Sequence, residues 1–269
     1  ISEMTEAARG ISEKNMNIRL NVSSSKTELK DLARTFNEMM DRIEDGYNRQ
    51  KQFVSDASHE LRTPIAVLQG YVDMLNRWGK NDKEVLQESI DAIKNESENM
   101  KDLVEQLLFL ARNDRGTLIL EKEKFSLTAL LEETIKDTVI IDKKHKLSSN
   151  IPKGINIYAD RNRIKQAIRI FLDNAMKYTP ENKAININLA VEKKYAVIEI
   201  IDTGIGMTEE EMRHIFDRFY RSDKSRKREK GGHGLGLSIA KIIILSHGGK
   251  INVRSKPSVG TNIRIIMPI

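Results

Sequence analysis

The amino-acid sequence predicts a helical hairpin followed by an α/β sandwich made of one sheet and one helical layer. Through about the first 115 residues, apolar side chains recur at steps of three and four, which is typical of helices that pack along one face. From about residue 118, short strand-like runs alternate with helical stretches, which indicates a layered α/β domain. Charged residues make up 31% of the chain and aromatic residues 5%, a balance that favours long helices with charged surfaces.

The composition also excludes some classes of site. The chain has no cysteine, so disulfides and thiolate metal sites are excluded. Its formal charge is +6, but 39 acidic residues are interleaved with 45 basic ones, so the excess is only weak evidence for nucleic-acid binding. No apolar run approaches the roughly 20 residues of a membrane span, and the sequence begins with Ile1. We therefore expect a soluble fragment of a longer protein.

The first 50 residues are expected to form a small input segment. A short periodic run precedes a polar connector in which Ile18, Leu20 and Val22 alternate with polar residues. A second helix is expected from near Glu28, and its apolar pattern continues into the following residues without a break. A continuous helix of this kind could pass rotation or tilt to the next segment.

A potential nucleophile and a potential base stand next to each other at His59 and Glu60 in this long helix. His59 lies outside the apolar seam, so its imidazole should face solvent. The Glu60 carboxylate can hold the imidazole in one tautomer or accept its proton. Pro64 removes the donor that would bond the Glu60 carbonyl and should bend the helix just past the histidine. Taken alone, His59 and Glu60 favour the simpler interpretation of a solvated helix face. The seam consists of Val54, Ala57, Leu61, Ile65, Leu68, Val72 and Leu75.

The long helix should end near Gly79, where Asn81 with Glu84 resembles a capping box for a returning helix. The two helices would form an antiparallel hairpin, with residues 113–116 as its terminator and linker. A single hairpin cannot bury seams this wide, so we expect it to pair with a second copy into a four-helix bundle. The returning seam consists of Leu86, Ile90, Ile93, Met100, Leu103, Leu107 and Ala111.

The second half is expected to fold as the α/β sandwich, with a short capped helix from Thr208 to His214. The expected strands run from Leu118 to Leu120, Ile155 to Tyr158, Ile185 to Val191, Tyr195 to Ile201, Lys250 to Val253 and Asn262 to Met267. The expected longer helices run from Leu127 to Ile141, Arg161 to Tyr178 and Leu235 to Leu245.

Two glycine-rich runs stand at junctions where backbone N–H groups could approach an anion. Residues 202–206, Asp-Thr-Gly-Ile-Gly, follow an expected strand, and residues 231–236, Gly-Gly-His-Gly-Leu-Gly, open an expected helix. Glycine permits the close approach, and the helix start adds the positive end of its dipole. The charged run at 221–230 is expected to be a lid. The order differs from a dinucleotide-binding unit and from a Walker loop, so a different kind of phosphate site is predicted.

Three chemically distinct side chains gather at the end of the helix that precedes these runs. Asn174, Lys177 and Tyr178 fall within about one helical turn. An amide oxygen suits a hydrated Mg²⁺, an ammonium group suits phosphate, and an aromatic face suits a base. The helix dipole alone could explain Lys177, but it does not explain all three residues.

Five motifs together resemble those of the bacterial sensor histidine kinases of two-component systems, and they occur in the order of that family. They are residues 58–64 (H box), 173–178 (N box), 202–206 (G1 box), 216–221 (F box) and 232–237 (G2 box). The first 50 residues resemble a HAMP signal-relay module that lacks its start, because residues 36–40 match the end of that pattern. The resemblance implies a HAMP-like module at 1–50, a dimerisation and histidine phosphotransfer hairpin at 51–114, and an α/β sandwich ATPase domain of the Bergerat type at 118–269.

The resemblance implies a reaction. ATP would phosphorylate His59 while Glu60 takes its proton, and the phosphoryl group would pass to an aspartate of a response regulator. Thr63 matches the position that orients water for dephosphorylating that regulator. The ATPase domain would swing on the linker at residues 113–116, within a homodimer whose full-length form is anchored to the bacterial membrane.

The resemblance also implies the nucleotide contacts. Asn174 would hold Mg²⁺, Tyr178 would lie against adenine, and Asp202 would accept the adenine amino group. The family's second asparagine, one turn earlier, is replaced by Ile170, so the metal would depend on Asn174 with water and phosphates. Phosphate charge and the shape of the pocket would involve Lys177, Gly204, Gly206, Arg221, Gly232, Gly234, Leu235, Gly236 and Thr261.

Two other functions stay open at this point. One is a catalytically silent dimeric scaffold that binds nucleotide or a regulator without turnover. The other is a protein whose phosphatase activity, dependent on Thr63, outweighs its kinase activity. Direct DNA binding by residues 221–230 is least favoured, because a lid beside a nucleotide site explains that charged run better.

Overall fold

The computed structural model describes residues 17–20, 27–79, 82–222 and 232–269. The chain divides into two compact units, residues 1–93 and residues 94–269. The expectations for residues 1–16 and 21–26, for Asn81 and for most of the charged run at 221–230 fall outside the described residues.

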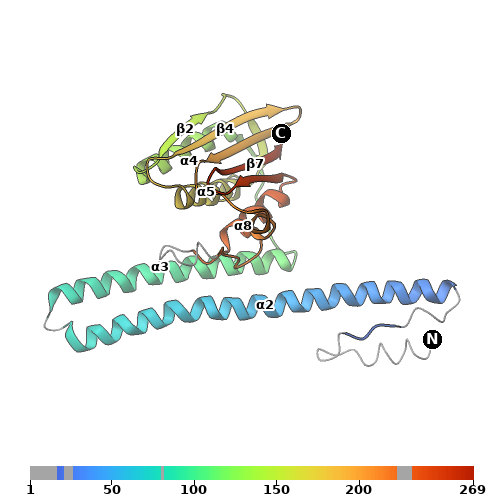
Figure 1. Cartoon of the computed structure of the whole chain (residues 1–269), viewed down its shortest axis with the longest axis horizontal. Helices are drawn as coiled ribbons and strands as arrows, with labels where there is room; N and C mark the ends of the chain where they lie inside the picture. Colours follow the sequence, from blue (N-terminus) through green and yellow to red (C-terminus); the bar gives the residue numbers. More distant parts are fainter. Residues whose placement is uncertain (1–16, 21–26, 80–81, 223–231) are drawn as a thin grey trace. The chain divides into compact units, whose positions relative to one another are not determined.

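The first unit is dominated by α2 (Thr27–Trp78), a helix of 52 residues. It runs without interruption through His59 and Pro64, as the continuous apolar pattern predicted (Figure 1). The bend expected at Pro64 stays a prediction, because the residues on both sides of it remain helical. His59 is exposed, as predicted.

Residues 17–20 lie along α2. The side-chain amide of Asn37 accepts a hydrogen bond from the Leu20 N–H (2.8 Å) and donates one to the Leu20 carbonyl (3.0 Å). Arg19 forms ion pairs with Asp41 (2.7 Å) and Glu44 (2.6 Å). Because one amide satisfies both backbone groups of Leu20, the connector is held to the helix by direct hydrogen bonds.

A short turn separates α2 from α3 (Lys83–Asp114). The cap of α3 is Asp82, whose carboxylate accepts hydrogen bonds from the N–H groups of Glu84 (2.9 Å) and Val85 (3.2 Å). The capping box expected from Asn81 lies outside the described residues, and the cap that the structure describes is Asp82. The carboxylate satisfies N–H donors that the first turn of a helix leaves without partners.

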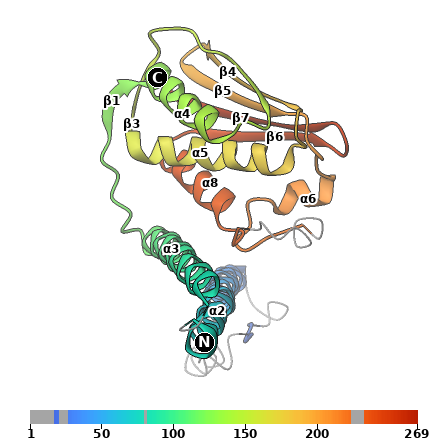
Figure 2. The same cartoon turned by 90° about the vertical axis from the view of Figure 1, so that its left-hand side faces the viewer.

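The second unit contains a five-stranded mixed sheet with helices on one face (Figure 2). The strand order is β2-β4-β5-β7-β6; β2 pairs with β4 in parallel and the other pairs are antiparallel. A separate antiparallel pair joins β1 to β3. The predicted α/β sandwich is confirmed. The strands are β1 (Glu123–Ser126), β2 (Lys146–Asn150), β3 (Asn156–Ala159), β4 (Ala184–Glu192), β5 (Tyr195–Asp202), β6 (Lys250–Lys256) and β7 (Gly260–Pro268).

The helices of this unit are α4 (Leu127–Ile141), α5 (Arg161–Tyr178), α6 (Glu209–His214) and α8 (Gly236–Ser246). The bounds of α4 and α5 agree with the prediction to the residue. Their N-caps explain why: the Ser126 side chain accepts from the Ala129 N–H, and the Asp160 side chain accepts from the Arg163 N–H. The short capped helix predicted from Thr208 is also present: Thr208 is its N-cap and forms a capping box, since Thr208 and Glu211 bond each other's backbone N–H groups.

The sequence analysis predicted one strand that is absent from the structure, and it missed a strand that is present. The apolar run Leu118 to Leu120 is not a strand, and its Ile119 is 84% exposed. β1 begins instead at Glu123, and β2 was missed because Lys146 to Asn150 is almost entirely polar. β2 lies at an edge of the sheet, where a strand need not be apolar on either face.

Alternating burial along the central strands places the core between the sheet and the three longer helices. Ile185, Ile187 and Leu189 of β4 are buried, whereas Asn186 and Asn188 between them are partly exposed. Each such buried aliphatic side chain contributes about 1.5–3 kcal/mol relative to its exposed state. Residues contributed by the other elements include Leu130, Leu131, Ile168, Phe171, Ile198, Ile200, Ile239, Ile243, Ile263 and Ile265.

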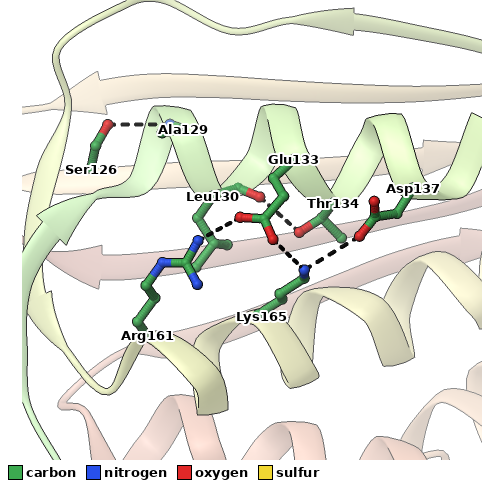
Figure 3. A network of polar contacts seen from close by, with 8 residues as sticks. All are labelled: Ser126, Ala129, Leu130, Glu133, Thr134, Asp137, Arg161 and Lys165. Carbon is green, nitrogen blue, oxygen red and sulfur yellow. Dashed lines mark hydrogen bonds and ion pairs between the residues drawn. The ribbon is translucent and has the colours of Figure 1, made fainter.

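A polar network on α4 and α5 aligns these two helices (Figure 3). Glu133 accepts hydrogen bonds from Arg161 and from Lys165 (2.6 Å), and Lys165 also reaches Asp137 (3.3 Å). The hydrogen bonds from Lys165 and Arg161 lower the pKa of Glu133, against a smaller opposing effect of burial. Because these groups are partly solvated, the network defines the helix alignment more than it stabilises the fold.

His247 makes a buried polar contact between α8 and α5. Its Nε2 atom accepts a hydrogen bond from the Asp160 N–H (3.0 Å), and its Nδ1 atom donates to the Ile243 carbonyl (2.7 Å). These contacts require the neutral ring with the proton on Nδ1. Burial lowers the pKa of His247, the bond to Ile243 opposes this, and the nearby Lys122 lowers it further.

This arrangement predicts a loss of stability in acid. His247 titrates at a lower pH in the folded state than in the unfolded state, so below about pH 6.5 the unfolded state binds more protons. The contribution of His247 is therefore present at neutral pH and is lost as the pH falls, by at most about 1.4 kcal/mol per pH unit. Thermal unfolding followed by far-UV circular dichroism at pH 7.5 and 5.5 should show a smaller decrease for His247→Gln, which cannot titrate. Equal decreases in both proteins would contradict the prediction.

Candidate functional site

A cavity of about 380 Å³ lies within the second unit, at the carboxyl-terminal end of α5. The loop after β5, the start of β7 and the residues before α8 complete its wall. Small-molecule sites in proteins commonly have this size. The structure places most of the predicted nucleotide residues on its lining: Asn174, Lys177, Tyr178, Asp202, Gly206, Arg221, Gly232, Gly234, Gly236 and Thr261.

Two predicted residues lie behind the lining. Gly204 is not on the cavity wall; a Cβ atom there would be 2.5 Å from the Tyr178 carbonyl oxygen, so glycine permits the loop to pack on α5. Leu235 is fully buried, and its carbonyl accepts hydrogen bonds from Ser238 Oγ (2.8 Å) and from the Ile239 N–H (3.1 Å). Both residues therefore support the cavity from outside.

Asp202 places an oriented carboxylate in this cavity. It ends β5, and its Oδ1 atom accepts hydrogen bonds from the N–H groups of Gly204 (2.8 Å) and Thr261 (3.2 Å). Partial burial raises the pKa of Asp202, while these two N–H donors act in the opposite direction. A carboxylate held in this way is an acceptor with a defined direction, which suits an amino group of a ligand.

The last turn of α5 presents the polar groups that the sequence placed together. The Asn174 Nδ2 group donates to the Ile170 carbonyl (2.7 Å), which leaves the Oδ1 atom for a ligand. The Lys177 ammonium lies 5.2 Å from the centre of the Tyr178 ring. The Tyr178 carbonyl accepts from the Ile205 N–H (3.1 Å) and so ties the end of α5 to the loop after β5.

Glycine is required at two lining positions. Gly206 has φ +63°, and a Cβ atom there would be 1.9 Å from the Lys256 carbonyl oxygen. Gly234 has φ +73°, and a Cβ atom would be 2.7 Å from the carbonyl carbon of Phe219. Gly232 differs, because no atom of the described residues lies within 4 Å of its Cβ position. The two glycine runs of the sequence therefore contain both essential and replaceable members.

One important residue was missed by the sequence reasoning. Gly260 has φ +131°, and a Cβ atom there would lie 2.0 Å from the Asp202 carbonyl oxygen. This close approach lets the following residue, Thr261, donate its N–H to the Asp202 side chain. The signal that could have found it is a glycine directly before the last apolar strand.

His59, Glu60 and Thr63 lie on α2, in the first unit. Consecutive helical residues point about 100° apart, and accordingly His59 is exposed whereas Glu60 is half-buried. Thr63 follows His59 by four residues and is also exposed, so these two side chains share one helix face. The Ser58 hydroxyl is occupied by a hydrogen bond to the Val54 carbonyl (2.7 Å).

Three domains of known families match successive parts of the chain. A HAMP domain model matches residues 1–45, a His Kinase A (phospho-acceptor) domain model matches residues 49–116, and a model of histidine kinase-, DNA gyrase B- and HSP90-like ATPases matches residues 159–269. The signal transduction histidine-protein kinase ArlS of Staphylococcus aureus (strain USA300) is 41% identical over 249 residues. The chain belongs to the bacterial sensor histidine kinases. The resemblance inferred from the five motifs is thereby confirmed.

The match to ArlS covers 92% of this histidine kinase and 55% of the relative, so the chain spans about half the length of the curated relatives it matches. Among solved structures, the Acinetobacter baumannii histidine kinase AdeS has a TM-score of 0.59 at 26% identity, covering 78% of this kinase and 97% of that chain. The histidine kinase ThkA, solved in complex with the response regulator protein TrrA, has a TM-score of 0.63 at 25% identity. The match covers 84% of this chain and 66% of the ThkA chain.

The described part of this histidine kinase contains no helix that is both long and apolar enough to cross a membrane.

Proposed function

We propose that this histidine kinase phosphorylates itself on His59 with ATP and then passes the phosphoryl group to an aspartate of a response regulator. The observation that carries the proposal is the cavity in which the oriented Asp202 carboxylate, the Lys177 ammonium and the Gly206 loop lie together. A carboxylate at one end suits a base with an amino group, and a cation with backbone N–H groups suits phosphates.

In the proposed complex, Asp202 accepts the adenine amino group and Tyr178 lies against the base. Lys177 and Arg221 meet the phosphates, and their positive charge stabilises the charge on the transferred group. Thr261 and four glycines, Gly206, Gly232, Gly234 and Gly236, shape the wall, while Gly204 and Leu235 support it.

Mg²⁺ is proposed as the metal. No group of three or more His, Cys, Asp or Glu that could hold a metal occurs in the described ranges. Mg²⁺ does not need one, because it commonly keeps several waters and binds through one or two protein oxygens plus substrate phosphates. The Oδ1 atom of Asn174 fits that requirement, since its Nδ2 partner is anchored to Ile170. When bound, the metal would neutralise phosphate charge.

The proposed chemistry at His59 uses both nitrogens of its neutral ring. One neutral ring nitrogen attacks the γ-phosphorus, a P–N bond forms, and the P–O bond to ADP breaks. With the phosphoryl group on one nitrogen and a hydrogen on the other, the ring would be positively charged. Glu60 therefore takes the proton from the second nitrogen. Exposure of His59 leaves it accessible both to ATP and to the regulator. Thr63, on the same helix face, is proposed to orient the water that hydrolyses the aspartyl phosphate of the regulator in the phosphatase reaction.

A homodimer is proposed from the helical hairpin. Val54, Ile65 and Val72 of α2 are 57%, 43% and 46% exposed although they belong to the predicted seam. On α3, Leu86 and Ile90 are also exposed. A second copy would cover these apolar side chains in a four-helix bundle. The domain bounds 1–50, 51–114 and 118–269, and a membrane anchor in the full-length protein, are part of the same proposal.

The proposed function is tested by incubating the full chain with γ-labelled ATP and Mg²⁺. We expect a label that is lost in acid and kept in base, because the P–N bond of phosphohistidine hydrolyses in acid. Adding a receiver domain should move the label to that protein. ATP binding without any label, even with a receiver domain present, would indicate the silent scaffold and overturn the kinase proposal.

A further inference from the structure

Ser255 connects three parts of the cavity wall through one hydroxyl group. It lies on the edge strand β6, opposite Thr261 of β7. Its Oγ atom accepts a hydrogen bond from the Met207 N–H (2.8 Å), donates to the Gly260 carbonyl (3.0 Å), and lies 2.9 Å from the Thr261 Oγ1 atom. Met207 and Thr261 both line the cavity, whereas Ser255 does not.

All three contacts can be hydrogen bonds at the same time in only one arrangement of the two hydroxyl hydrogens. A hydroxyl group has one hydrogen and two lone pairs. The Ser255 hydrogen goes to the Gly260 carbonyl, and one lone pair receives the Met207 N–H. The remaining lone pair can only accept, so the Thr261 hydroxyl donates its hydrogen to Ser255. With its hydrogen directed to Ser255, the oxygen of Thr261, a residue of the cavity lining, can act only as an acceptor toward a further partner.

The surrounding turn holds this arrangement in place. The Ser258 N–H donates to the Ile205 carbonyl (2.7 Å), so the turn between β6 and β7 is bonded to the loop after β5. The Thr261 N–H donates to the Asp202 carboxylate. Asp202 and Thr261 are therefore neighbours on the wall, and both present acceptors.

We infer that Ser255 is a positioning residue for nucleotide selectivity: it orients the Thr261 hydroxyl as an acceptor, so that this wall accepts adenine and disfavours guanine. The inference rests on the proposed nucleotide-binding function. Adenine carries an amino group at the purine position where guanine carries a carbonyl oxygen. Two acceptors, the Asp202 carboxylate and the Thr261 oxygen, match the amino group and oppose the carbonyl.

Removing the Ser255 hydroxyl should weaken this selectivity. In Ser255→Ala the Thr261 hydroxyl loses its acceptor and can turn its hydrogen toward the cavity, where it would donate to the guanine carbonyl. The Met207 N–H also loses its partner. We expect ATP affinity to fall about threefold to tenfold, the usual effect of one neutral hydrogen bond, while GTP affinity is kept or rises. The ratio of ATP affinity to GTP affinity should therefore fall by at least about threefold.

The experiment is calorimetric titration of the full chain with ATP and with GTP. The variants are Ser255→Ala and Ser255→Thr, which keeps a hydroxyl and should restore the wild-type ratio. Ser148→Ala is the matched control: Ser148 is also on an edge strand, its hydroxyl bonds Asn186, and neither residue lines the cavity. Far-UV circular dichroism verifies that each variant is folded.

A lower ATP-to-GTP ratio in Ser255→Ala, restored in Ser255→Thr and unchanged in Ser148→Ala, is the expected result. Loss of both affinities by the same factor would mean that Ser255 only supports the fold, and it would overturn the inference. An unchanged ratio would overturn it as well. Failure of the wild-type chain to bind ATP would instead overturn the proposed function on which the inference rests.

Discussion

Replacing His59 with glutamine is expected to reduce the phosphoryl label to background while leaving ATP affinity unchanged. Glutamine is polar and keeps the exposed helix face, but its amide has no nucleophilic nitrogen, so no P–N bond can form. His59 lies on α2, in the other unit from the cavity, so the substitution should leave the cavity lining intact. Labelling with γ-labelled ATP and titration with ATP measure the two quantities separately.

The control for this experiment is His214→Gln. His214 is an exposed histidine of α6 that is hydrogen-bonded to Asp217 (2.7 Å). It has no place in the proposed reaction, so its variant should be labelled like the wild type. Equal labelling of His59→Gln and the wild type would show that the phosphoacceptor is another residue.

Replacing Gly206 with alanine is expected to lower ATP affinity by more than tenfold and to destabilise the second unit. The Cβ atom would lie 1.9 Å from the Lys256 carbonyl oxygen, and the φ of +63° adds the cost of a left-handed conformation. That conformation alone costs about 1–2 kcal/mol for a residue with a Cβ atom. Because the obstructing atom is backbone, the loop after β5 must move away from the turn between β6 and β7.

Gly232→Ala provides the matched control. Gly232 lines the same cavity, yet within the part of the chain that the structure describes no atom lies within 4 Å of its Cβ position. Its variant should keep the wild-type unfolding temperature, and its ATP affinity should change by less than threefold. Unfolding is best followed by circular dichroism, since the single tryptophan, Trp78, belongs to α2. If both alanine variants bind ATP equally well, the tight approach at Gly206 does not matter for the site.

Sequence patterns predicted the longer elements because the forces that form them are local. α4 and α5 show helical apolar periodicity bounded by Ser126 and Asp160, whose side chains cap the first turn. In β4 apolar and polar residues alternate, and β5 is a largely apolar run; both patterns are long enough to predict a strand. β1 and β2 were not predicted, because short polar strands are defined by the partner strand they pair with.

The sequence by itself determined the family, the exposure of His59 and the set of residues around the proposed nucleotide site, since motifs and helical periodicity are properties of neighbouring residues. Only the tertiary structure separated Gly206, where glycine is obligatory, from Gly232, where it is not. It alone revealed Gly260 and Ser255, which act on Asp202 and Met207. Ser255 is 48 positions from Met207, and Gly260 is 58 positions from Asp202. Their roles depend on backbone atoms that only sheet pairing brings together.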